Sequence, residues 1–344
     1  MLGLSSPPSM RREIRMPASC VLGPRSRVRR GYALAAALTS LASVAAPAAA
    51  DGGSGRTGGP AGPRPTVVAV HGAFADASSW NAVVERLQRA GYPVVAPANP
   101  LRGLAQDSTY ISSVLKSIQG PIVLVGHSYG GAVISSAANG NRQVKALVFI
   151  DALMPDKGEV LSELAAKFRG SELSSALKSV PFRNADGTMG ADLYLQPDKL
   201  RRVFAADLPA AMTQQMAVSQ RPIAASAFAG RAAAAAWRAI PSWALVGTKD
   251  KAIAPDVERF EAKRAGSHTI EVSSSHVAMI SHPDAVTDLI LAAAAAKSAP
   301  AKPALAATGS KSLVLMELGT VAGAAVLAGA GLVKSARRRR GPAR

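Results

Sequence analysis

The residues best suited to chemistry are a serine, an aspartate and a histidine that follow one another in that order along the chain. Ser128 is the centre of the pentapeptide Gly126-His127-Ser128-Tyr129-Gly130, which comes directly after the apolar run 122–125. A G-x-S-x-G sequence between a buried strand and a helix is typical of a strained turn that lifts the serine hydroxyl above the edge of a sheet. The flanking glycines let neighbouring backbone pass close by. Ser128 is therefore the candidate nucleophile.

A nucleophilic serine needs a general base and a carboxylate that orients the base. Asp250 lies four residues after the strand-like run 243–246, on the loop Gly247-Thr248-Lys249-Asp250, and is the preferred carboxylate. Asp151 directly follows another strand-like run, 147–150, and is the alternative, because some hydrolases carry the acid after that strand.

His276 is the candidate general base. It follows the strand-like run 269–272 on a loop of small residues, Ser273-Ser274-Ser275. The rival, His282, precedes Pro283 and is better explained as a polar residue at the start of a helix. The remaining histidines, His71, His127 and His268, belong to turns or to the start of a strand, which favours structural roles for them.

Two backbone amides should stabilise the negative charge that develops on the carbonyl oxygen of the substrate. One is the N–H of the residue after the nucleophile, Tyr129. The other should come from the loop after the first core strand, where His71-Gly72 precedes Ala73 and Phe74. Ala73 is the preferred donor, and Phe74 is the alternative.

Together these stretches resemble the α/β-hydrolase superfamily, in particular its small esterase branch of bacterial EstC-like esterases and plant methylesterases and hydroxynitrile lyases. The likeness spans residues 66–296. It implies an α/β fold with a mostly parallel sheet flanked by helices, a triad of Ser128, Asp250 and His276, and an oxyanion hole formed by Ala73 and Tyr129. The stretches that carry it are His71-Gly72-Ala73-Phe74-Ala75-Asp76-Ala77-Ser78-Ser79-Trp80, Gly126-His127-Ser128-Tyr129-Gly130-Gly131, Gly247-Thr248-Lys249-Asp250 and Ser275-His276.

One position departs from part of that group. Its lyase members carry a lysine directly after the catalytic histidine, whereas this chain has Val277. The resemblance therefore implies an esterase that forms and hydrolyses an acyl-enzyme, rather than a cyanohydrin lyase.

About ninety residues separate Asp151 from the strand-like run at 243, too many for one crossover helix. We expect a helical cap over about 155–240, inserted before the strand that carries the acid. Helices are expected at 160–168, 173–178, 197–204 and 209–218. Some of the apolar residues of this segment should line the substrate pocket: Leu161, Leu164, Leu193, Leu195, Phe204, Met212, Met216 and Phe228.

The formal net charge of +18 comes largely from the two ends of the chain. Residues 51–308 contain 26 basic and 20 acidic residues, a net charge of +6. No basic motif with interleaved aromatic residues is present, so nucleic acid is not an expected partner. No metal-ligand spacing or phosphate-binding loop is found either, and we expect neither a metal nor a cofactor.

The first fifty residues predict an export signal. A basic region to Arg30 precedes the apolar run 32–46, and Ala48-Ala49-Ala50 is a small-residue cleavage site. Arg29-Arg30 would also suit twin-arginine export, and a start at Met16 would give a more usual signal length. The only cysteine, Cys20, lies within this signal, so the exported product would contain no cysteine and no disulfide. A Gly/Pro-rich linker, 51–65, follows.

The other end of the chain predicts a surface anchor. An Ala/Pro-rich linker, 297–304, leads to Leu305-Ala306-Ala307-Thr308-Gly309, then to the apolar span 313–333 and the basic tail. At 1.5 Å per residue, the span would cross roughly 30 Å of hydrocarbon. The order resembles a sortase sorting signal of Gram-positive actinobacteria, which implies cleavage between Thr308 and Gly309 and attachment to peptidoglycan. A plain membrane anchor is the alternative.

The sequence thus predicts an exported serine esterase that acts on small, largely apolar esters at the cell wall. Another reaction of the same triad, such as C–C hydrolysis or perhydrolysis, and a receptor-like ligand-binding role are the alternatives.

Overall fold

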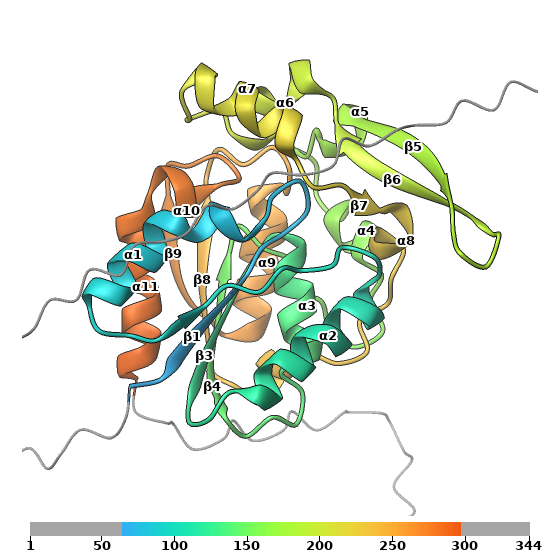
Figure 1. Cartoon of the computed structure of the whole chain (residues 1–344). Helices are drawn as coiled ribbons and strands as arrows, with labels where there is room; N and C mark the ends of the chain where they lie inside the picture. Colours follow the sequence, from blue (N-terminus) through green and yellow to red (C-terminus); the bar gives the residue numbers. More distant parts are fainter. Residues whose placement is uncertain (1–63, 297–344) are drawn as a thin grey trace, which may run out of the picture. The chain divides into compact units, whose positions relative to one another are not determined.

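The computed structural model describes residues 64–296, which form a central sheet of six parallel strands (Figure 1). The strands lie in the spatial order β2-β1-β3-β4-β8-β9, so β1 lies next to the edge strand β2 and the later strands follow in order on its other side. They are β1 (Thr66–Val70), β2 (Val94–Val95), β3 (Ile122–His127), β4 (Val144–Ile150), β8 (Ser242–Gly247) and β9 (His268–Val272).

The inner strands are continuous apolar runs because helices cover both of their faces. Every residue of β3 and β8 is buried, whereas the edge strand β9 has exposed residues at four of its five positions. The strands predicted at 243–246, 269–272 and 147–150 correspond to β8, β9 and β4, and their ends differ by at most three residues.

Helices cover the two faces of the sheet (Figure 1). On one side, α1 packs against α11; on the other lie α2, α3 and α9. The short helix α10 precedes α11, and a 3-10 turn, η1, precedes α1. Their bounds are η1 Ala77–Trp80, α1 Asn81–Arg89, α2 Leu104–Ser117, α3 Tyr129–Ala137, α9 Pro255–Ala265, α10 Ala278–Ser281 and α11 Pro283–Ala295.

Local sequence explains the ends of α9, which lies behind the site described below. Pro255 occupies its first turn, where a missing backbone N–H costs no helical hydrogen bond. Gly266 ends the helix in the left-handed conformation, with φ of 61°.

The segment between β4 and β8 forms the expected cap, but the cap is not purely helical. It contains a three-stranded antiparallel sheet in the order β5-β6-β7. Its elements are α4 (Leu161–Ala165), α5 (Leu173–Ala176), β5 (Leu177–Arg183), β6 (Met189–Leu195), α6 (Pro197–Phe204), α7 (Ala210–Ser219), β7 (Ile223–Ala224), α8 (Ala225–Phe228) and the 3-10 turn η2 (Ala236–Arg238).

The helix predicted at 173–178 is thus wrong at its end, since it stops at Ala176 and a strand begins at Leu177. The hairpin between β5 and β6 turns at Asn184-Ala185-Asp186-Gly187, where Gly187 has φ of 86°. The Gly187 N–H donates to the Asn184 carbonyl at 3.0 Å, which closes the turn. Glycine adopts this positive φ readily, and an Asp-Gly pair in the sequence is typical of a hairpin turn.

Within residues 64–296, no helix combines the length and the apolar character that crossing a membrane requires. The predicted export signal, 1–50, and sorting signal, 305–344, lie outside the described residues, as do the linker 297–304 and all of the linker 51–65 except Arg64 and Pro65.

Candidate active site

Ser128 lies on a strained turn between β3 and α3. Its φ of 56° is positive, which costs energy for a residue with a Cβ atom. The tight turn explains two glycines, because an added Cβ would lie 2.7 Å from the Gly130 oxygen at Gly126 and 2.6 Å from the Val70 oxygen at Gly130. These contacts leave no room for a side chain, so the turn requires glycine at both positions.

The structure brings Ser128, His276 and Asp250 into one chain of hydrogen bonds. The Nε2 atom of His276 is 2.8 Å from the hydroxyl oxygen of Ser128, and its Nδ1 atom is 2.5 Å from Oδ2 of Asp250. All three side chains are buried. An Nδ1–H donated to Asp250 leaves Nε2 free to accept the proton of the Ser128 hydroxyl.

Asp250 is held by backbone as well. Its Oδ1 atom accepts hydrogen bonds from the N–H groups of Ala252 and Ile253, at 2.6 and 3.0 Å. These two bonds fix the orientation of the carboxylate independently of its bond to the imidazole.

The charges around His276 favour its protonated form. Burial opposes a charge on the ring, but the carboxylates of Asp250 and Asp151 outweigh burial and raise the pKa of His276 above its usual value. The Asp250 carboxylate, which is hydrogen-bonded to the ring, would stabilise the imidazolium that forms when Ser128 gives up its proton.

Asp151, the alternative acid, does not contact the imidazole by a hydrogen bond. Its Oδ2 atom accepts the N–H of Ala278 at 3.0 Å. Burial and the neighbouring Asp250 raise the pKa of Asp151 to about 8. Asp151 thus holds the backbone after His276, whereas Asp250 holds its ring.

The other histidines make structural contacts. His127 donates from Nε2 to the carbonyl of His276 at 2.8 Å, and burial lowers its pKa well below the usual value. His71 accepts the N–H of Asn99 at Nε2, 2.9 Å away, and donates from Nδ1 to the Gly72 carbonyl. His282 bonds the hydroxyl of Ser281, and His268 stacks on Trp243.

The two predicted oxyanion donors flank Ser128. Tyr129 begins α3, and a first-turn N–H has no acceptor within its own helix. Among the described residues, the N–H of Ala73 makes no hydrogen bond, whereas the N–H of Phe74 donates to the Arg221 carbonyl at 2.9 Å. Phe74 is therefore engaged with the cap, and the geometry favours Ala73.

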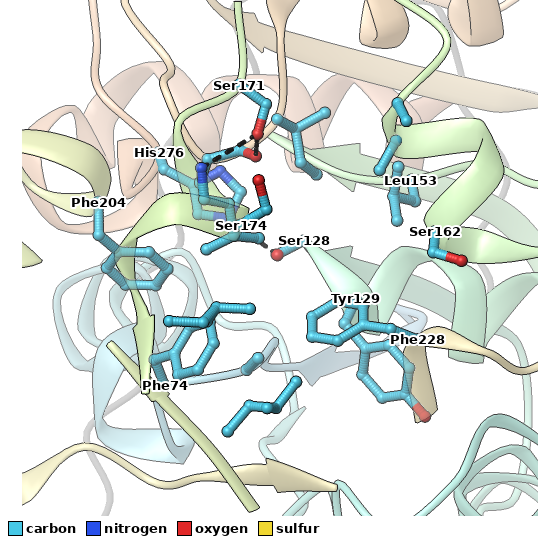
Figure 2. Close-up of a pocket in the computed structure, with 18 of the residues that line it drawn as sticks. Phe74, Ser128, Tyr129, Leu153, Ser162, Ser171, Ser174, Phe204, Phe228 and His276 are labelled. Atoms are coloured by element: carbon cyan, nitrogen blue, oxygen red, sulfur yellow. Dashed lines mark hydrogen bonds between the residues drawn. The ribbon is translucent and has the colours of Figure 1, made fainter. Parts of the chain in front are cut away.

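Ser128 and His276 face a cavity of about 400 Å³ between the sheet and the cap. Figure 2 shows the aromatic rings of Phe74, Tyr129, Phe204 and Phe228 around the space in front of Ser128. Much of the remaining wall is aliphatic, from Leu153, Leu173, Leu177, Leu193 and Ile253. Ser162, Ser171 and Ser174 add hydroxyl groups that the sequence analysis did not single out.

The apolar cap residues divide into three groups. Leu193, Phe204 and Phe228 line this cavity, as expected. Leu161, Leu164 and Leu195 are buried and do not line the cavity. Met212 and Met216 do not line the cavity; they line a separate hollow beside η1, because their face of α7 points away from Ser128.

Among residues 64–296, one set of possible metal ligands lies close together: Asp250, Glu258 and His276, each with a ligand atom within 4.8 Å of the others. A cation bound there would have to break the hydrogen bond between His276 and Asp250. We therefore interpret the set as an acid–base group. Glu258 was not singled out in the sequence, although it lies three residues before Glu261 on the same face of α9.

Comparisons with known proteins agree with this geometry. Residues 67–289 match the model of the Alpha/beta hydrolase family. The chain belongs to this family. The predicted fold class, an α/β-hydrolase fold built on a mostly parallel sheet, is thereby confirmed.

Two relatives of known name match the chain at 32% and 26% sequence identity. A Carbendazim hydrolyzing esterase of Nocardioides sp. (strain SG-4G) is 32% identical over 123 residues, 31% of this chain and 50% of that esterase. The match therefore spans only half of that relative. Alpha/beta hydrolase nvfD of Aspergillus novofumigatus (strain IBT 16806) is 26% identical over 255 residues, 67% of this chain and 97% of that protein.

Solved structures share the fold. The crystal structure of polyneuridine aldehyde esterase superposes with a TM-score of 0.58 at 19% identity, covering 67% of this chain and 99% of that one.

Proposed function

We propose that this alpha/beta hydrolase cleaves small, largely apolar carboxylic esters with Ser128 as the nucleophile. The observation that carries the proposal is the continuous chain of hydrogen bonds from Ser128 through His276 to Asp250. Ser128 and His276 lie at the wall of a mainly apolar cavity. Kinship with a Carbendazim hydrolyzing esterase supports the reaction class.

The reaction would proceed in two halves. Nε2 of His276 removes the hydroxyl proton of Ser128 while the Ser128 oxygen attacks the carbonyl carbon of the ester. The N–H groups of Ala73 and Tyr129 stabilise the resulting oxyanion. His276 then gives its proton to the leaving alcohol, and an acyl-enzyme on Ser128 remains.

In the second half, His276 removes a proton from water, and the hydroxide attacks the acyl carbon. The tetrahedral intermediate collapses, the carboxylic acid leaves, and the proton returns from His276 to Ser128. Asp250 keeps the imidazole oriented and stabilises its positive charge in both halves.

The cavity supports the substrate class. A cavity of about 400 Å³ suits a small molecule, and its wall is mainly aromatic and aliphatic. Val277, in the position after His276, is fully buried and adds no charge to the site.

The test is hydrolysis of p-nitrophenyl esters from acetate to octanoate by the purified protein, beside the Ser128→Ala variant. Ser136→Ala, on the adjoining helix α3 but outside the cavity, is the matched control. A fluorophosphonate label read by mass locates the nucleophile. Steady turnover that is lost only with Ser128→Ala supports the proposal, whereas labelling of Ser128 without turnover would favour a receptor-like role or another reaction of the same serine.

We also propose that the enzyme is exported and held at the cell wall, with residues 1–50 as the export signal and residues 305–344 as the sorting signal. The order of LAATG, an apolar span and a basic tail supports this localisation. Thr308→Ala should move the protein from the wall fraction to the membrane or the medium. Unchanged fractionation would favour a plain membrane anchor.

A further inference from the structure

Helix α9 places an unpaired acidic side chain directly behind the candidate site. Glu258 is 3% exposed, and neither of its carboxylate oxygens accepts a hydrogen bond from the described residues. A buried carboxyl group without a partner is costly. The acid of the site lies close to it, since Glu258, Asp250 and His276 each have a polar atom within 4.8 Å of the others.

The ionisable groups that face Glu258 are almost all acidic. Asp250 and Asp151 lie on the loops after β8 and β4, and Glu261 lies one turn further along α9. His276 is the one group of this cluster that can become positive. Two neighbouring carboxylates closed off from water cannot both stay ionised without a cation between them. Burial first, and then Asp250 and Asp151, raise the pKa of Glu258 well above its usual range.

A neutral carboxyl group has an O–H that must donate, and the carboxylate of Asp250 is an acceptor within reach. Asp250 has capacity for this bond, because its two oxygens offer about four lone-pair positions and accept three hydrogen bonds in the structure. A proton on Glu258 therefore removes its buried charge and gives one of its two oxygens a hydrogen-bond partner.

We infer that Glu258 is a positioning residue for Asp250, which as a neutral acid donates an O–H hydrogen bond to the carboxylate that orients His276. The inference rests on the proposed function for its catalytic consequence. The added bond locks the Asp250 carboxylate and withdraws some of its negative charge from the imidazole. Without that bond, Asp250 would attract the His276 proton more strongly, and the neutral base would appear only at higher pH.

Two uncharged replacements separate this role from simple packing. Glu258→Gln keeps a donor, because its amide N–H can reach Asp250, whereas Glu258→Met keeps the volume without a donor. Neither changes the charge of a neutral Glu258. We expect Gln to label with fluorophosphonate within about threefold of the wild-type rate. We expect Met to label roughly tenfold slower or worse, the scale of a lost hydrogen bond to a charged group.

The pH profile and the steady-state constants supply readouts that packing would not move. In Glu258→Met, the acid limb of the pH profile of the labelling rate should shift to higher pH. For ester hydrolysis, kcat should fall with little change in KM. Glu258→Gln should retain the wild-type limb. Equal rates and equal limbs in both variants would overturn the inference, as would a Gln variant as damaged as the Met variant.

A spectroscopic test works without turnover and without the Met variant. At pH 7, the infrared spectrum of Glu258→Gln should lack a protonated-carboxyl band that the wild-type spectrum contains. Loss of a carboxylate band instead would overturn the inference even if Glu258→Met fails to fold. If wild-type Ser128 resists the fluorophosphonate while the protonated band is present, the proposed function fails and the placement of the proton on Glu258 stands.

Discussion

Asp207 of the cap accepts hydrogen bonds from both the backbone N–H and the side-chain hydroxyl of Ser275, the residue before His276. Phe204, at the end of α6, packs its ring 5.0 Å from the imidazole of His276, centroid to centroid. The cap therefore does more than cover the cavity. It holds the loop that carries the candidate base, so a change in the cap can alter the chemistry beneath it.

Replacing Asp207 with Ala should lower kcat about tenfold with a smaller effect on KM, because His276 would lose its attachment to the cap. Burial opposes a charge on Asp207, but the hydrogen bonds from Ser275 outweigh it and lower the pKa of this carboxyl. Asp198→Ala, at an exposed position on α6, is the matched control. Steady-state kinetics with p-nitrophenyl esters would measure both, and equal kinetics in the two variants would contradict a role for the link.

The two candidate acids can be separated by conservative replacements. Asp250→Asn should lower kcat by roughly 10³-fold or more, because an amide cannot stabilise the imidazolium and favours the wrong tautomer of His276. Asp151→Asn should cost less than about tenfold, since its amide oxygen can still accept the Ala278 N–H. Kinetics of the two variants, with folding checked by circular dichroism, decides the order. The reverse order would assign the acid to the end of β4.

Tyr129 offers a change that should affect stability more than rate. Its hydroxyl donates to Oδ2 of Asp107 at 2.7 Å, and both side chains are buried. Tyr129→Phe removes this bond but keeps the backbone N–H proposed for the oxyanion. We expect the free energy of unfolding to fall by about 1–3 kcal/mol, with kcat within about threefold of wild type. Denaturant unfolding and ester kinetics would measure the two effects. A large loss of kcat without a loss of stability would place the hydroxyl in the reaction.

Gly72 lies against the nucleophile. A Cβ added there would be 2.6 Å from the Ser128 Cβ, whereas a Cβ added at Gly103 meets nothing within 4 Å. Gly72→Ala should therefore displace Ser128 or the loop before Ala73 and lower the rate of Ser128 labelling at least tenfold. Gly103→Ala, the control, should label like wild type. Similar labelling of both would mean that this loop can move away without cost.

The positions of the candidate triad followed from the sequence because the evidence for them is local. Each of Ser128, Asp250 and His276 comes on a loop after an apolar run, and the carboxyl ends of parallel strands meet at one edge of a sheet. Asp151 directly follows β4, so it lies at the same edge of the sheet. Only the contacts distinguish it from Asp250, since Asp151 bonds backbone and Asp250 bonds the ring.

The residues that the sequence did not reveal act over long separations in the chain. Asp207 and Ser275 are 68 residues apart, and no local pattern predicts their pairing. The β5–β6 hairpin was missed because helix-forming residues at 173–176 lead straight into it. Met212 and Met216 were expected at the substrate pocket, but spacing along a helix cannot say which way their shared face points.

Glu261 should make the protein less stable as pH rises. Its Oε1 atom accepts the Met154 N–H at 2.6 Å, the side chain is fully buried, and burial raises its pKa to about 8 despite Arg264 nearby. The folded state thus keeps a proton that the unfolded chain releases near its ordinary pKa of 4.5. The folded state therefore binds more protons between pH 4.5 and about 8, and stability falls across that window as pH rises.

Glu261→Gln keeps an oxygen acceptor for Met154 but cannot ionise. Relative to wild type, the variant should gain stability steadily from pH 4.5 to about 8 and gain no more above it. One pKa unit corresponds to about 1.4 kcal/mol, so the gain should reach a few kcal/mol. Denaturant unfolding of both proteins at matched pH values measures the difference, which cancels the contributions of Asp151 and Glu258. A difference that is constant with pH, or that grows toward acid, would show that Glu261 is ionised in the folded protein.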